Sequence, residues 1–101
     1  MFYSGLNSEF LIARIDYQNN LIFLCDGSKW QARRMDTKTL ALWSPGQLVQ
    51  VTSSEVDKYP FELINKDIFG SPNIRVRLLE VFLPGDEEWL RESAQDLRLI
   101  D

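Results

Sequence analysis

The fold is decided by the stretch Leu21-Ile22-Phe23-Leu24-Cys25-Asp26-Gly27-Ser28-Lys29-Trp30. An apolar run is followed by Asp-Gly and then by a short run that alternates around Trp30. Asp-Gly between two strand-like runs is a strong hairpin signal, because tight hairpin turns require a positive φ that glycine adopts without steric cost. Both faces of the first run are apolar, which suits a central or tightly coiled barrel strand. The stretch therefore predicts a hairpin within a small β-barrel.

Further strand-like runs lie on both sides of this hairpin. They cover residues 9–16, 48–52, 61–65 and 73–82, each bounded by turn residues. Before the second run, Pro45 and Gly46 suit the two central positions of a type II turn. For residues 33–43 two alternatives stay open. Either Asp36 caps a short helical turn, or a loop leads into a strand over residues 40–43.

The C-terminal stretch has a different, helical pattern. Pro84-Gly85 ends the last strand, and Asp86 is a suitable helix N-cap followed by two glutamates in the first turn, where the helix dipole favours negative charge. Apolar residues then recur at helical spacing, at Trp89, Leu90, Ala94 (or Ser93), Leu97 and Ile100. We expect one domain over residues 1–101. It is mainly β, with a five- or six-stranded antiparallel barrel of the SH3-like or OB-like type over residues 9–83 and an amphipathic, acidic α-helix over residues 84–101.

Composition and charge narrow the class of protein. The chain has 101 residues, 45% hydrophobic and 26% charged, which is ordinary for one globular domain. No apolar run approaches the roughly 20 residues of a membrane helix, and the N-terminus does not have the pattern of a secretory signal. A single cysteine excludes an internal disulfide and suits the cytoplasm.

The net charge of −4 is unevenly placed. Residues 84–101 hold six acidic and two basic side chains, which accounts for all of it, whereas the first 83 residues carry nine of each. An acidic tail on a neutral body argues against general affinity for nucleic acid or anionic membrane.

Side chains that usually carry catalysis are scarce. The chain has no histidine, which removes the commonest general base and the usual zinc ligand. Cys25 has no activating neighbour in the sequence and is expected to be a small buried residue. The alternative is a carboxylate-dependent enzyme, in which Asp26 and Asp36 converge across a barrel end as a glycosidase-like acid pair, but Asp26 is already explained by its turn. The sequence predicts no enzyme, no cofactor and no metal.

Two binding functions remain. The first is recognition of another protein by aromatic residues at the barrel rim or by the C-terminal helix. Its candidate residues are Trp30, Trp43, Tyr59, Phe61, Trp89, Leu90 and Leu97. The tryptophans have an alternative role as plugs that close the barrel ends, and the helix has one as a homodimer contact.

The second binding function is recognition of single-stranded nucleic acid by a basic face with a stacking aromatic, as in OB-folds. Its candidate residues are Lys29, Trp30, Arg33, Arg34, Arg75 and Arg77. The alternative is a solvated face that balances nearby carboxylates. The neutral body and the acidic isoelectric point of about 4.8 make nucleic acid the less expected partner.

Several short motifs occur in a fixed order. They are Ile15-Asp16, Asn20-Leu21-Ile22, Asp26-Gly27-Ser28-x-Trp30, Trp43-x-Pro45-Gly46-x-x-Val49, and Tyr59-Pro60 with Leu63-Ile64-Asn65. In this the chain resembles a family of small uncharacterised bacterial proteins with a DGS-x-W hairpin and a W-x-x-G-[DQ]-x-V turn. The resemblance covers roughly residues 10–80, with Gln47 where aspartate is commoner. It implies a β-barrel and a bacterial source, and no activity.

Overall fold

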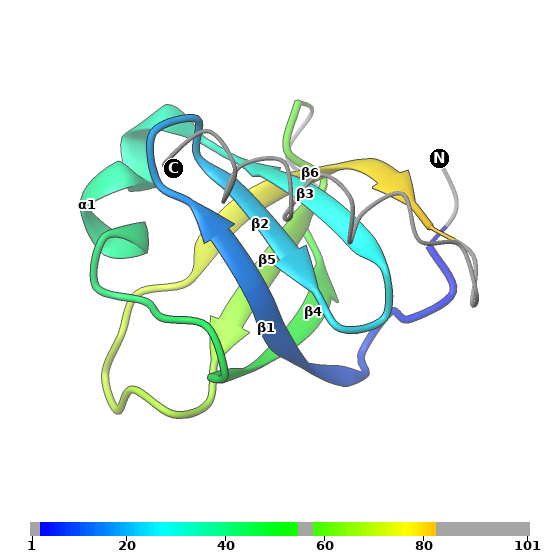
Figure 1. Ribbon diagram of the computed structural model, residues 1–101, viewed down its shortest axis with the longest axis horizontal. Coiled ribbons are helices and arrows are strands. Elements are labelled where there is room, and N and C mark those ends of the chain that lie inside the picture. Colours follow the sequence, from blue (N-terminus) through cyan, green and yellow to red (C-terminus); the bar gives the residue numbers. More distant parts are fainter. Residues whose placement is uncertain (1–2, 55–57, 83–101) are drawn as a thin grey trace, which may run out of the picture.

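The computed structural model describes residues 3–54 and 58–82 of the chain. These residues form six β-strands and two short helices (Figure 1). The strands are β1 (Glu9–Asp16), β2 (Leu21–Leu24), β3 (Ser28–Ala32), β4 (Leu48–Ser53), β5 (Phe61–Asn65) and β6 (Ile74–Val81). Between β3 and β4 lie the 3-10 helix η1 (Arg34–Asp36) and the α-helix α1 (Thr37–Leu40).

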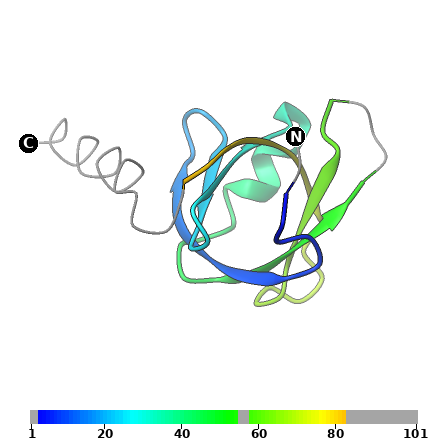
Figure 2. The same cartoon turned by 90° about the vertical axis from the view of Figure 1, so that its right-hand side faces the viewer.

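The strands close into an antiparallel barrel in the order β1-β2-β3-β6-β5-β4. The ring closes where β1 pairs with β4, with Glu9 opposite Gln50. A second long-range pairing joins β3 to β6, with Ser28 opposite Val81. Figure 2 looks into the ring of strands, with α1 behind it. The predicted small antiparallel barrel is confirmed, and each described strand has two neighbours, so none of them presents an open edge.

The hairpin predicted at Asp26-Gly27 joins β2 to β3. Gly27 has a φ of +87°, and the carboxylate of Asp26 accepts hydrogen bonds from the Ser28 backbone N–H at 3.0 Å and from the Ser28 hydroxyl at 2.5 Å. The Ser28 hydroxyl in turn accepts a hydrogen bond from the indole N–H of Trp30 at 2.7 Å. The turn therefore also orients the largest side chain of the core.

Trp30 lies at the centre of the barrel core. Its ring meets those of Tyr3 and Phe61 edge-on, with centroid distances of 4.9 and 5.2 Å, an arrangement that aromatic pairs prefer. Tyr3, from the segment before β1, and Leu40 and Trp43, from the α1 region, belong to the same buried cluster. The N-terminal segment and the α1 region thus both contribute to the core.

One alternative for residues 33–43 is wrong, because residues 40–43 do not form a strand. Leu40 is the last residue of α1. Asp36 does not cap the helix through its side chain. Instead its carboxylate accepts hydrogen bonds from the backbone N–H of Arg75 at 2.9 Å and from the guanidinium of Arg33 at 3.1 Å. Long-range bonds to β6, rather than a local cap, hold this helical segment on the barrel.

The prediction of a buried Cys25 is also wrong. Cys25 is the first residue after β2, and it is exposed. Its backbone N–H donates to the carbonyl of Leu11 at 2.9 Å. The backbone is thus held by β1 while the residue remains open to solvent.

The helix predicted over residues 84–101 lies outside the described residues. Strand β6 ends at Val81, and Phe82 is buried beside the β2–β3 turn, where its N–H donates to the carbonyl of Gly27 at 2.8 Å. Among the described residues, no helix has the length and apolar character needed to cross a bilayer.

Candidate functional site

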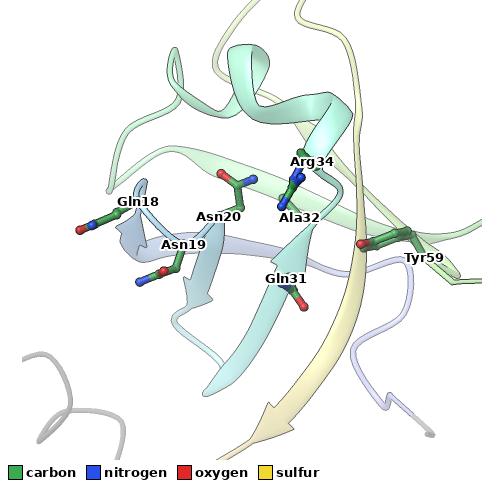
Figure 3. Close-up of a pocket in the computed structure, with 7 residues that line it drawn as sticks. All are labelled: Gln18, Asn19, Asn20, Gln31, Ala32, Arg34 and Tyr59. Carbon is green, nitrogen blue, oxygen red and sulfur yellow. The ribbon is translucent and has the colours of Figure 1, made fainter.

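A polar pocket opens at the ends of β1, β2 and β3 (Figure 3). Its volume is about 340 Å³, and its lining residues are Gln18, Asn19, Asn20, Gln31, Ala32, Arg34 and Tyr59. Four of the seven are carboxamides, so we call it the amide pocket. Carboxamides both donate and accept hydrogen bonds, and they match the peptide groups of an extended chain as well as the edges of nucleobases.

The β1–β2 turn supplies three of these carboxamides. Asn19 is held by Asp16, whose carboxylate accepts from its side-chain amide at 2.9 Å. Asn20 has a positive φ of 56°, a conformation that asparagine tolerates. Its carbonyl accepts from Ala32 at 2.8 Å, and its side-chain amide donates to the Thr37 hydroxyl at 2.9 Å. The turn is therefore tied to both β3 and α1.

The opposite wall of the pocket consists of Tyr59 and the end of β3. The guanidinium of Arg77 lies over the ring of Tyr59, 6.0 Å from its centroid, and its Nε donates to the side-chain oxygen of Gln31 at 2.8 Å. Arg34 is exposed at the mouth of the pocket. The pocket thus combines an aromatic ring, carboxamides and a cationic group.

Exposed apolar side chains lie near the same end of the barrel. Met35 in η1 and Leu42 after α1 have exposed fractions of 80% and 73%, and Phe69 in the β5–β6 loop is fully exposed. Figure 1 shows α1 at the upper left of the molecule and this loop below it on the same side. We call Met35, Leu42 and Phe69 the apolar end. Large apolar side chains left in water on neighbouring segments are typical of an interaction surface.

Trp43 connects the segments that carry the apolar end. Its indole N–H donates to the hydroxyl of Ser71 in the β5–β6 loop at 3.0 Å, and its carbonyl accepts from the Tyr17 hydroxyl at 2.5 Å. Tyr17 itself is nearly half exposed and precedes the carboxamides of the amide pocket. The buried Trp43 therefore holds three segments together: its own segment after α1, the β5–β6 loop, and the β1–β2 turn that begins at Tyr17.

Of the residues predicted for protein binding, the structure buries some in the core and places one in the wall of the amide pocket. Trp30 and Trp43 are buried in the core, so the expectation that they present a rim surface is wrong. Phe61 is partly buried and packs against the core, whereas Tyr59 lines the amide pocket. Trp89, Leu90 and Leu97 lie outside the described residues.

The residues predicted for nucleic-acid binding are only partly brought together. Arg33 pairs with Asp36 at 3.1 Å, and Arg75 pairs with Glu62 at 3.6 Å. Lys29 lies opposite Glu80 on the outer face of β3. Trp30 points into the core and cannot stack on a base. Arg34 and Arg77 remain beside the amide pocket, where Tyr59 replaces Trp30 as the nearby ring.

The carboxylates of Asp26 and Asp36, which could have formed a catalytic acid pair, do not lie together. Asp26 precedes β3, and Asp36, the last residue of η1, lies beyond the other end of that strand, so the length of β3, roughly 16 Å, separates the two positions. Each carboxylate is occupied by its own partners, Ser28 and Arg33 among them. Within residues 3–54 and 58–82, no cluster of acidic or cysteine side chains has a metal-binding arrangement.

Sequence reasoning missed most of the residues at this end. The apolar end could not be predicted from the sequence. Leu42 fits one of the two alternatives for its segment, a strand over residues 40–43, and Met35 and Phe69 are single apolar residues within polar segments. The signal that could have found Gln18, Asn19 and Asn20 was their run of three carboxamides after Tyr17, which we interpreted as a turn.

Comparison with known proteins found no counterpart. No protein-family model, no curated protein and no solved structure matches this chain. The resemblance to a bacterial barrel family therefore stays a prediction, and the proposals below depend on the geometry.

Proposed function

We propose that this domain is a non-enzymatic module that binds another protein through the α1 end of its barrel. The observation that carries the proposal is the exposure of Met35, Leu42 and Phe69 on segments that Trp43 holds together, in a barrel that also has a structured polar pocket. Small SH3-like and OB-type barrels commonly bind extended chains at their rims. The apolar end supplies anchoring contacts, and the amide pocket supplies hydrogen bonds for the peptide groups next to them.

The charge around this surface favours an acidic partner. Arg34, Lys38 and Lys66 are exposed in the segments that carry the apolar end. Asp67 in the β5–β6 loop keeps its negative charge while it accepts a hydrogen bond from the backbone N–H of Leu48 at 2.7 Å, so these three cationic side chains outweigh it. The proposed ligand is therefore a polypeptide segment with apolar residues flanked by aspartate or glutamate. The proposal includes a cytoplasmic location, because the exposed thiol of Cys25 is stable in a reducing compartment.

The test is selection of peptides from a random phage-displayed library on the full chain. We expect the selected peptides to be acidic and apolar, and to lose at least tenfold in affinity when Met35, Leu42 and Phe69 are all replaced by serine. The matched control replaces Leu6, Leu11 and Val81, three other exposed apolar residues, by serine and leaves binding unchanged. Peptides that bind both triple variants equally, or a failure to select any, would overturn the proposal.

A second candidate function, binding of single-stranded nucleic acid, is favoured by one observation. Tyr59 and Arg34 both line the amide pocket, and the guanidinium of Arg77 lies over the Tyr59 ring. An aromatic ring near cations is the pattern of strand-binding barrels. It ranks second because Arg33 and Arg75 are paired with carboxylates. Titration with labelled oligonucleotides at low salt should then show binding that Tyr59→Ala weakens; no binding would eliminate this function.

A further inference from the structure

Gln31 offers the amide pocket hydrogen-bond donors rather than an acceptor. Its side-chain oxygen accepts from two nitrogens of the Arg77 guanidinium, with Nε at 2.8 Å. The remaining polar atom of the side chain is the amide nitrogen, which carries two N–H groups. No described residue accepts a hydrogen bond from that nitrogen. Arg77 therefore leaves Gln31, which lines the pocket, with donors only.

Arg34 and Tyr59 add two further donors. Figure 3 shows Arg34 directed from η1 back toward β3, and Tyr59 with its hydroxyl turned toward the same strand. Neither the guanidinium of Arg34 nor the Tyr59 hydroxyl has a hydrogen-bond partner among the described residues. None of the described lining residues is acidic, and the guanidinium of Arg77 adds a second positive charge over the Tyr59 ring. We call Gln31, Arg34 and Tyr59 the donor side of the pocket.

Asn20 offers the pocket an acceptor. Its side-chain amide donates to the Thr37 hydroxyl at 2.9 Å, and its side-chain oxygen has no donor among the described residues. A ligand that suits both the donor side and this oxygen is an anion with an N–H group close to it. An aspartate within a peptide has both groups, because its side-chain carboxylate lies near its own backbone N–H.

We propose that the amide pocket binds the side-chain carboxylate of an aspartate in the partner peptide. The donor side donates to the carboxylate, and the side-chain oxygen of Asn20 accepts from the peptide N–H. Bonds from a guanidinium to a carboxylate are stronger than bonds between neutral groups. The pocket volume of about 340 Å³ lies at the lower end of the range for ligand sites, so it suits a small group. This inference rests on the proposed function and adds the side chain that the pocket recognises.

The test is an NMR titration of the isotope-labelled full chain with a blocked aspartate, N-acetyl-aspartate N-methylamide. We expect saturable shifts of the side-chain signals of Gln31 and Arg34, with a dissociation constant in the millimolar range that is usual for so small a ligand. The blocked asparagine has nearly the same shape without the charge, and it should bind at least tenfold more weakly.

Two variants with matched controls locate the site. Gln31→Glu replaces the donating nitrogen by an oxygen and should lose at least tenfold in affinity for the blocked aspartate. Gln47→Glu makes the same change outside the pocket, at a glutamine whose oxygen is likewise engaged, with the N–H of Ser44 at 2.9 Å, and should bind as the parent chain does. Arg34→Gln should also lose at least tenfold, whereas Lys38→Gln, which removes the same charge nearby in the chain, should not.

Three outcomes overturn the inference. They are the absence of saturable shifts in the parent chain, equal binding of the blocked asparagine, and equal losses in the variants and their controls. Tighter binding of inorganic phosphate at the same signals would also overturn it, in favour of a nucleic-acid strand.

Failure of this inference is distinguishable from failure of the proposed function. The variant with Met35, Leu42 and Phe69 replaced by serine should still bind the blocked aspartate, because this probe is too small to need the apolar end. Selection of acidic, apolar peptides without any binding of the blocked aspartate would overturn the inference alone. Binding of the blocked aspartate without any selected peptide would overturn the proposed function and leave the carboxylate site in place.

Discussion

Gly27 meets two requirements at one position. Its φ of +87° lies in the left-handed region, and a Cβ there would approach the carbonyl oxygen of Phe82 to 2.5 Å. Gly46 has a similar φ of +89°, but nothing lies within 4 Å of the position of its Cβ. Substitutions at the two glycines can therefore be compared to separate the cost of backbone strain from the cost of steric overlap.

We expect Gly27→Ala to lower the free energy of unfolding by roughly 3 kcal/mol or more, because strain and overlap with a backbone atom add together. Gly46→Ala, which meets strain alone, should cost about 1 kcal/mol. Urea unfolding of both variants measures the difference. Equal losses would mean that the Phe82 backbone moves away easily and that the contact is unimportant.

Tyr3 is a second residue whose environment has a measurable consequence. Burial, and then the hydrogen bond to Asp26 and its negative charge, raise the pKa of Tyr3 well above its ordinary value of 10.0, while a hydrogen bond with Ser28 acts in the opposite direction. Above about pH 10 the unfolded chain loses this proton and the folded chain keeps it. Stability is therefore complete below that pH and falls as the pH rises.

We expect Tyr3→Phe to be less stable than the parent chain at neutral pH by about 1 kcal/mol, because one hydrogen bond is lost. Its stability should fall less steeply as the pH rises above about 10, because the titrating group is gone. Unfolding by urea at a series of pH values provides both quantities. Parallel curves for the two proteins would show that Tyr3 does not contribute to the alkaline loss.

At the scale of elements, Asp36 decides where the short helical region lies. One carboxylate accepts from Arg33 in the preceding segment and from the backbone of Arg75 in β6. A separate bond, from the Arg33 backbone N–H to the Arg75 carbonyl at 2.9 Å, continues the contact. Because α1 spans four residues, it has little helical stability of its own and depends on such attachments.

We expect Asp36→Ala to lower the free energy of unfolding by about 2–3 kcal/mol, because it leaves the N–H of Arg75 without its acceptor and removes the partner of Arg33. Asp36→Asn keeps one acceptor oxygen and should lose less. Thermal unfolding ranks the two variants. Protection of the Arg75 amide in hydrogen exchange should fall in Asp36→Ala, and unchanged protection would contradict this account.

At the scale of the whole molecule, closure of the ring depends on contacts between distant parts of the chain. β1 must meet β4, with Glu9 opposite Gln50, and β3 must meet β6, with Ser28 opposite Val81. Bringing such segments together costs chain entropy before the contacts stabilise the fold.

We therefore expect refolding in milliseconds to seconds, as for other barrels rich in long-range pairings. Stopped-flow fluorescence can follow it, because Trp30 and Trp43 become buried as the core forms. The variant Trp43→Phe removes the fluorescence of the α1 end and so separates it from the fluorescence of Trp30 at the barrel centre. Relaxation in microseconds would show that local contacts dominate folding.

Part of the binding surface could be predicted from the sequence and part could not. Arg34 and Tyr59 were among the predicted binding residues, and both line the amide pocket. Their assembly with the carboxamides of the β1–β2 turn depends on the pairing of β2 with β3 and on the position of α1, which no local pattern encodes. Met35 and Phe69 were missed for the same reason, since their exposure is a property of the folded surface.

The sequence by itself determined the hairpin at Asp26-Gly27, the strands around it and the turn at Gly46, because φ preferences and alternation of apolar residues act over a few neighbours. Only the tertiary structure decided that Trp30 and Trp43 are core residues, that Cys25 is exposed and that, of the two alternatives for residues 33–43, the helical one holds. Those outcomes depend on which strands become neighbours when the ring closes. Burial is a sum over contacts between residues far apart in the chain, and a local pattern does not contain that sum.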